Sequence, residues 1–216
     1  MKRTAIICLF LMLSSFALAQ ADSAVLDRNF VFKDGIFLNF QQVLNNNPVP
    51  KSKIITDISQ YDLDFYDKLL EKKTLKFYYN GTVQEVNTGD IWGYSDNGSL
   101  YIHWNDEFNK IPVVGSLGHF IASKLVTTYS SPYSSWYYDP YDYNTTTTRE
   151  IFQYILDFRT GKVYDFTVSS LLYLMQKYDK ELYDEYSKLS RRKRKKMMFY
   201  YLRKFNSRNK IYLPKQ

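Results

Sequence analysis

The chain has 216 residues, of which 24% are charged and 18% are aromatic. This length allows one domain with a sizeable core, and the composition argues against a membrane-spanning protein and against disorder over most of the chain. The net charge of +7 is unevenly distributed, because residues 188–216 hold twelve Lys or Arg and no acid, whereas residues 20–187 hold 15 basic and 22 acidic residues. We therefore expect a basic tail attached to an acidic body.

The amino end has the pattern of a secretory signal peptide. Lys2 and Arg3 precede an apolar run over 5–16, and 17–19 (Ala-Leu-Ala) offers the small residues that a signal peptidase recognises. The run is shorter than the ~20 residues that span a bilayer, so residues 1–19 are expected to be cleaved. The only cysteine, Cys8, lies in this run, so the processed chain has no thiol and no disulfide. The pattern predicts export from a bacterial cell, to the periplasm or the cell surface.

Short elements are expected in the first part of the exported chain. Residues 20–29 are predicted to be a linker. Asn39 is a favourable N-cap for a brief helix. The spacing of the apolar residues predicts strands over 30–32, 36–38 and 53–58 and helices over 40–45 and 64–72.

Three hairpins are predicted from turn residues between apolar runs. Asn80-Gly81 separates 75–79 from 83–86, and Asn97-Gly98 separates 91–94 from 100–104. Asn-Gly supplies the two positive φ angles of a tight hairpin turn. A third hairpin is expected at 151–166, around Gly161. Two further apolar runs predict strands over 111–114 and 120–127.

The carboxy-terminal part is predicted to be helical over 167–206. Thr167, Asp179 and Ser190 can each cap a helix, and the apolar residues that follow them recur at helical spacing. Strands first and helices last indicate an α+β fold with an antiparallel sheet, for which barrel-like closure is left open. Residues 30–216 are expected to form this single domain.

Several phrases resemble a family of uncharacterised exported proteins of Gram-negative bacteria. The phrases are DGIFL at 34–38, NNP at 46–48, IWGY at 91–94, IPVVGSLGHF at 111–120, DFRTGK at 157–162 and DKELY at 179–183. The resemblance covers most of the exported chain and implies export and one common fold. It implies no activity and gives no residue a role.

Motifs for catalysis or metal binding are weak. His103 and His119, together with Asp96, Asp106 or Glu107, could form a metal or acid–base site, but the spacing matches no metal motif. Histidines that are hydrogen-bonded within the sheets are the favoured interpretation. The chain has no nucleophile elbow, P-loop or dinucleotide-binding glycine motif. We therefore predict no metal and no cofactor.

A long loop rich in tyrosine is predicted over 129–148. Tyr and Trp give a broad contact area at a small entropic cost, so this composition is typical of a binding surface. The alternative is a cover that packs on the sheet. The candidate contact residues are Tyr133, Trp136, Tyr137, Tyr138 and Tyr141.

The strongest charge run is RRKRKK, formed by Arg191, Arg192, Lys193, Arg194, Lys195 and Lys196. The run can bind a polyanion, such as lipid headgroups or an acidic envelope polysaccharide; nucleic acid is not expected for an exported chain. Alternatively it pairs with the acids of 179–185. This internal pairing is favoured, because an acidic segment directly precedes the run.

The sequence favours a non-catalytic binding module associated with the cell envelope. Its partner would be a protein or a glycan of the envelope. A hydrolase acting on envelope or dietary glycans is the alternative, and it requires two converging carboxylates or a histidine with a carboxylate.

Overall fold

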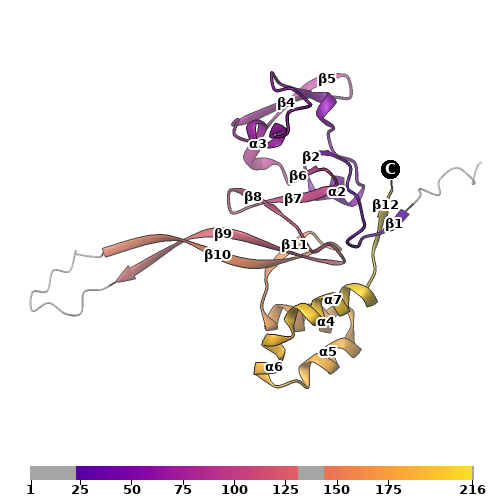
Figure 1. Cartoon of the computed structure of the whole chain (residues 1–216), viewed down its shortest axis with the longest axis vertical. Coiled ribbons are helices and arrows are strands. Elements are labelled where there is room, and N and C mark those ends of the chain that lie inside the picture. Colours follow the sequence, from indigo (N-terminus) through magenta and orange to yellow (C-terminus); the bar gives the residue numbers. More distant parts are fainter. Residues whose placement is uncertain (1–22, 131–143, 216) are drawn as a thin grey trace, which may run out of the picture.

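The structure is a computed structural model that describes residues 23–130 and 144–215. The molecule is elongated (Figure 1). One end consists of three strands and a helix, the other end of four helices, and further sheets lie between them. A long hairpin projects sideways from this middle region.

The sheet at the first end has the order β3-β4-β5. Its strands are β3 (Ile54–Ile55), β4 (Thr74–Tyr79) and β5 (Thr82–Asn87). Asn80 and Gly81 form the β4–β5 turn with φ of 49° and 81°, which confirms the predicted hairpin. Helix α3 (Phe65–Leu70) packs Phe65, Tyr66 and Leu69 against this sheet.

The central four-stranded sheet has the order β2-β6-β7-β8. Its strands are β2 (Gly35–Phe37), β6 (Gly93–Asp96), β7 (Ser99–Trp104) and β8 (Glu107–Lys110). The predicted Asn97-Gly98 turn joins β6 to β7. Asn39 caps α2 (Phe40–Leu44), as expected, by accepting a hydrogen bond from the Gln42 amide at 3.0 Å. Two short 3-10 helices, η1 (Lys51–Lys53) and η2 (Thr88–Asp90), complete this region.

The two longest strands are β9 (Leu117–Ser130) and β10 (Asn144–Asp157), which pair antiparallel along their whole lengths. Strand β11 (Lys162–Asp165) pairs with β10 only near its end, opposite Tyr154–Asp157. The outer parts of β9 and β10 therefore form a two-stranded arm that projects from the molecule (Figure 1).

The four helices follow β11. They are α4 (Val168–Tyr178), α5 (Lys180–Ser187), α6 (Arg191–Lys196) and α7 (Met198–Arg208). The side chains of Thr167, Asp179 and Ser190 cap α4, α5 and α6, which confirms the three predicted caps. The chain after Ser190 turns at Met197 and so divides into two helices.

The two ends of the described chain pair with each other. Strand β1 (Ser23–Val25) pairs antiparallel with β12 (Tyr212–Pro214), and Leu26 and Leu213 are buried in the main apolar cluster. The segment predicted as a linker over 20–29 is therefore part of the fold from Ser23 onward. Sequence patterns miss this pair because each strand has only three residues and its partner lies nearly 190 positions away.

The base of β9 and β10 separates two apolar clusters. Phe120, Ala122, Tyr154, Leu156 and Phe158 are buried with residues of the central sheet and of both termini. Leu117 and Ile155 point to the opposite face, where they pack against α4, α5 and α7. Alternation along a strand places successive side chains on opposite faces, so the same two strands organise both clusters.

The α+β class with antiparallel sheets is confirmed, since every strand pairing in the described residues is antiparallel. These strands form four sheets and no closed barrel.

The strands predicted at 30–32 and 111–114 are irregular segments, and the one predicted at 53–58 is reduced to Ile54–Ile55. The 129–148 loop prediction was wrong at its edges, because 129–130 and 144–148 belong to β9 and β10. β-branched residues there form cross-strand pairs such as Thr127 with Thr147, whose hydroxyl oxygens lie 3.1 Å apart.

Substitution of Leu213 tests whether the carboxy-terminal strand belongs to the core. Leu213 is 4% exposed, and its neighbour Tyr212 is 61% exposed. We expect Leu213→Ala to lower the free energy of unfolding by about 2–4 kcal/mol, because it leaves a cavity in the main cluster. Tyr212→Ala should change it by less than about 0.5 kcal/mol. Urea unfolding followed by circular dichroism measures both values, and equal effects would contradict the β1–β12 pairing.

Candidate functional site

The predicted tyrosine-rich surface lies outside the described residues. Tyr133, Trp136, Tyr137, Tyr138 and Tyr141 all fall within 131–143. The structure describes the two strands that lead to this segment and that end at Ser130 and Asn144. The role of these five aromatic residues stays a prediction.

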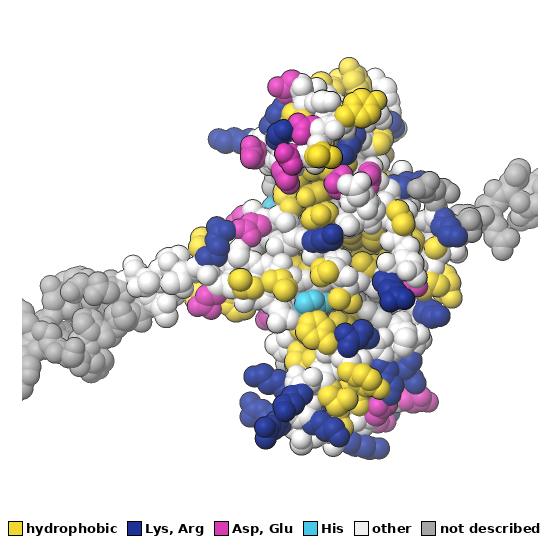
Figure 2. Space-filling view, in the orientation of Figure 1, with side chains coloured by type: hydrophobic (Ala, Val, Ile, Leu, Met, Phe, Trp, Pro, Cys, Tyr) yellow, Lys and Arg dark blue, Asp and Glu magenta, His cyan; other side chains and the backbone are white. Residues whose placement is uncertain are grey.

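The basic run forms α6, at the end of the molecule opposite the β3-β4-β5 sheet (Figure 1). Five of its six side chains are exposed, and that of Arg194 is half-buried. The space-filling view shows Lys and Arg side chains gathered on this end and pointing outward (Figure 2). Helical residues lie ~100° apart around the axis, so six consecutive cations surround the helix instead of lining one face.

The acids of α5 pair with α7 and not with α6. Lys204 Nζ lies 2.6 Å from Glu185 Oε2, and Arg208 contacts both Asp179 (2.7 Å) and Glu181 (2.9 Å). Lys180 and Asp184 pair within α5 at 3.4 Å. Within the part of the chain that the structure describes, none of the six residues of α6 forms an ion pair.

The favoured prediction, that 179–185 neutralises the basic run, is therefore wrong. The turn at Met197 explains the difference. Helix α7 runs in a different direction from α6. Lys204 and Arg208 lie one helical turn apart on α7, so both face α5 and form ion pairs with its carboxylates. The sequence signal for this pairing was the i, i+4 spacing of Lys204 and Arg208, which sequence analysis did not use.

The contacts between α5 and α7 also shift the pKa values of the acids. Hydrogen bonds from Arg208 lower the pKa of the Asp179 carboxyl below its usual value, against the opposing effect of partial burial. The hydrogen bond from Lys204 likewise lowers the pKa of Glu185. Both carboxylates are ionised at neutral pH, and their charges are already balanced by α7.

Helix α6 is held in place by its backbone. The hydroxyl of Tyr186, which is fully buried in the helical cluster, donates a hydrogen bond to the carbonyl oxygen of Arg194 at 2.9 Å. Burial raises the pKa of this hydroxyl to about 12, although nearby Arg194 opposes the shift. The hydroxyl therefore stays protonated and keeps donating at physiological pH, and the five exposed cationic side chains extend into solvent from a fixed helix.

Two aromatic residues lie next to the cationic helix. Phe199 and Tyr200, in the first turn of α7, are 39% and 48% exposed. Phe199 also contacts the rings of His119 and Phe166, with centroids 4.8 Å apart in both cases. Two partly exposed aromatic residues thus follow the unpaired cations of α6 closely in the chain. Sequence reasoning did not single out these two residues, because they fall outside the apolar positions that recur at helical spacing after Ser190.

The histidines occupy separate structural sites. His119 is 4% exposed, and its Nε2 lies 3.0 Å from Gln153 Oε1. Burial lowers the pKa of this imidazole, and the hydrogen bond to Gln153 only partly offsets the effect. His103 stacks on Phe108 in the central sheet. No group of three potential metal-ligating side chains occurs within residues 23–130 and 144–215.

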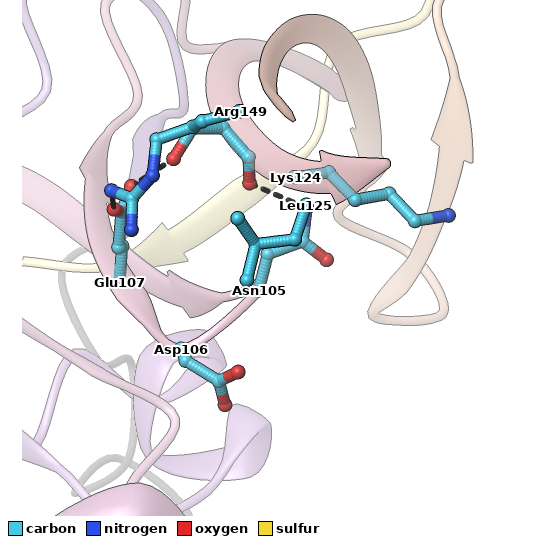
Figure 3. Close-up of a pocket in the computed structure, with 7 residues that line it drawn as sticks. Asn105, Asp106, Glu107, Lys124, Leu125 and Arg149 are labelled. Atoms are coloured by element: carbon cyan, nitrogen blue, oxygen red, sulfur yellow. Dashed lines mark hydrogen bonds and ion pairs between the residues drawn. The ribbon is translucent and has the colours of Figure 1, made fainter. Parts of the chain in front are cut away.

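A polar cleft of about 340 Å³ lies between the β7–β8 turn and the arm (Figure 3). Glu107 forms an ion pair with Arg149 and accepts a hydrogen bond from Ser123 Oγ at 2.5 Å. Asn105 donates to the Ser123 carbonyl oxygen at 3.0 Å, and the side chain of Asp106 points away from Glu107 (Figure 3). Arg149 neutralises the carboxylate of Glu107, and Asp106 does not converge with it. This cleft therefore does not have the two converging carboxylates that a glycan hydrolase requires.

Comparisons with protein-family models, curated proteins and solved structures gave no match for this chain. Among the described helices, none combines the length and the apolar character needed to cross a membrane. The surface chemistry of the molecule is therefore what bears on its function, and α6 is the candidate site.

The pairing of Asp179 with Arg208 predicts a pH-dependent contribution to stability. A carboxyl whose pKa is lower in the folded state stabilises the fold above its unfolded pKa of about 3.9, and this contribution is lost as the pH falls through the folded value. Asp179→Asn retains a capping oxygen but removes the charge, and should lower the free energy of unfolding by about 1 kcal/mol at pH 7.

Urea unfolding of the wild type and of Asp179→Asn between pH 7 and pH 2.5 measures this difference. The two free energies should converge at the acidic end of the range. Asp184→Asn serves as the control, because the exposed pair of Asp184 with Lys180 should contribute less than about 0.5 kcal/mol. A difference for Asp179→Asn that stays constant down to pH 2.5 would contradict the ion pair.

Proposed function

We propose that this protein is an exported, non-catalytic binding protein of the cell envelope that attaches through α6 to membranes with anionic lipid headgroups. The observation that supports the proposal is the separation of paired from unpaired cations. Of the twelve basic residues in 188–216, only Lys204 and Arg208 form ion pairs in the described structure. The other ten include all of α6.

Charge repulsion makes an external anion the natural partner of this helix. Like charges at i, i+3 and i, i+4 destabilise a helix by a few tenths of a kcal/mol per pair, and α6 contains five such pairs. Cations in the first turn also oppose the helix dipole. An anionic surface relieves both effects at once, without any conformational change.

Two features favour a lipid surface over a polysaccharide chain. The cations extend from a convex end of the elongated molecule, where a flat surface can approach without obstruction (Figure 2). Phe199 and Tyr200 follow α6 closely in the chain and are partly exposed, and aromatic rings near Lys and Arg suit the boundary between headgroups and acyl chains. A polysaccharide is more often held in a groove that combines aromatic faces with directed hydrogen bonds.

The remaining parts of the proposal come from the sequence. Residues 1–19 have the signal-peptide pattern, and the DGIF, NNP and DFRTGK phrases resemble exported proteins of Gram-negative bacteria. The tyrosine-rich segment is a candidate second contact for a protein or glycan of the envelope. The geometry of the polar cleft gives no support to the alternative of a hydrolase.

Neutralising α6 tests the membrane attachment. The variant carries Arg191→Gln, Arg192→Gln, Lys193→Gln, Lys195→Gln and Lys196→Gln, which leaves the half-buried Arg194 in place. Each Lys or Arg near an anionic surface contributes about 1 kcal/mol. Because a convex helix brings roughly three of the five to a flat membrane, we expect affinity for vesicles containing phosphatidylglycerol to fall about a hundredfold. Vesicle sedimentation measures it.

The matched control removes five exposed lysines that form no ion pair in the described structure and lie away from α6. They are Lys53, Lys73, Lys110, Lys124 and Lys162. Both variants have the same net charge, so only the α6 variant should lose binding. Equal losses would show that binding follows net charge alone. Binding to soluble alginate but not to the vesicles would replace the membrane with an acidic polysaccharide.

Export has its own test. The protein expressed with all 216 residues in a Gram-negative host should be recovered from the envelope fractions with Gln20 at its amino terminus. Mass spectrometry of the intact protein measures the processing. Recovery from the cytoplasm with Met1 still present would contradict export, while leaving the vesicle experiment unaffected.

A further inference from the structure

A second site, separate from α6, lies where three distant segments of the chain meet. A cleft of about 420 Å³ is formed by the residues that follow β1, the loop between β8 and β9, and the carboxy-terminal part of α7. This volume lies within the ~300–1,000 Å³ that is typical of small-ligand pockets. The lining is mostly apolar and includes Val25, Leu26, Val113 and Val114.

The cleft is held open by directional contacts. The side chain of Asn206 accepts a hydrogen bond from the Leu117 amide at 2.9 Å and donates one to the Leu117 carbonyl oxygen at 2.8 Å. Gly115 allows this approach, because a Cβ at that position would lie 2.5 Å from Asn206. On the opposite wall, the Leu26 amide donates to the Ile211 carbonyl oxygen at 2.9 Å. The three segments are therefore fixed relative to one another before any ligand arrives.

Three cations lie around this apolar cleft. Arg28, Arg203 and Lys210 line it and are exposed, and none of them forms an ion pair with another described residue. The only acid in the lining is Asp27, whose carboxylate accepts a hydrogen bond from the Asn29 amide. The site thus combines an apolar interior with a positive rim.

We propose that this cleft binds a fatty carboxylate, with its chain on the valine-lined floor and its carboxylate at the rim. Guanidinium groups recognise carboxylates with paired hydrogen bonds, and apolar side chains favour the alkyl chain. A small hydrophilic anion would leave the floor uncovered. A neutral alcohol of the same length would leave the three cations without a counter-charge. The proposal is independent of the attachment through α6.

Isothermal titration calorimetry with decanoate, decanol and acetate tests both parts of the ligand, at concentrations below those at which decanoate forms micelles. We expect one decanoate per chain, bound at least tenfold more tightly than decanol or acetate. Equal binding of decanol would overturn the role of the cations, and equal binding of acetate would overturn the role of the floor. Tighter binding of decyl phosphate than of decanoate would overturn the carboxylate assignment.

Two variants, with substitutions at exposed residues, locate the site on the molecule. Arg203→Gln with Lys210→Gln should weaken decanoate binding about five- to tenfold and leave decanol unchanged. Ser207→Trp should fill the cleft from α7 and weaken binding of decanoate at least tenfold. The matched controls are Lys53→Gln with Lys73→Gln, two exposed lysines outside the cleft and outside α6, and Ser52→Trp in η1, which should bind as the wild type does.

A thermal unfolding experiment gives an independent readout for the same variants. A ligand that binds only the folded state raises the unfolding midpoint, so decanoate should stabilise the wild type and both controls. It should stabilise the Arg203→Gln, Lys210→Gln variant less. Equal stabilisation of all variants would place decanoate elsewhere and overturn the proposal, whatever the outcome of the vesicle experiment on α6.

Discussion

Both faces of the β9–β10 base are buried, and this constraint organises the rest of the structure. Phe120 and Tyr154 face the cluster shared with the central sheet, while Leu117 and Ile155 face the helices. The side chain of Asn206 makes two hydrogen bonds with the backbone of Leu117, so α7 is attached to the strand in the way that a neighbouring strand would be. The position of α7 then determines both the ion pairs of α5 and the wall of the apolar cleft.

The helical period of α7 distributes its basic residues between two surfaces. Lys204 and Arg208 are four residues apart and face the acids of α5. Arg203 and Ser207 are also four residues apart but lie on an adjacent stripe, where Asn206 joins them in lining the cleft. Tyr201, Leu202 and Phe205 occupy the buried side. One helix therefore neutralises its neighbour, forms part of a ligand-sized cleft and completes the helical cluster.

Features determined by neighbouring residues could be predicted from the sequence. The Asn80-Gly81 and Asn97-Gly98 turns need positive φ at both residues, and the caps at Asn39, Thr167, Asp179 and Ser190 need only a side-chain oxygen three positions before an amide. Features determined by distant residues could not. The β1–β12 pair and the cleft join segments that are far apart in the chain, and the acids of α5 pair with α7 instead of the neighbouring α6. No local spacing of residues predicts these contacts. The threonines at 145–148 were assigned to a loop because of the tyrosine-rich composition beside them, although β-branched residues favour strands.

The pairing of α5 with α7 explains why the acidic segment 179–185 does not neutralise the basic run of α6. Overall charge balance would favour contact between α6 and any nearby acid. However, an exposed ion pair contributes only about 0–1 kcal/mol, whereas burying the apolar side of α7 contributes several times more. Packing therefore decides where the helices lie, and the acids of α5 pair with whichever cations packing brings to them. Those cations are Lys204 and Arg208, whose positions are set by the burial of Tyr201, Leu202 and Phe205 on the same helix. In this arrangement the cations of α6 have no acidic partner among the described residues, and for that reason they are available to an external anion.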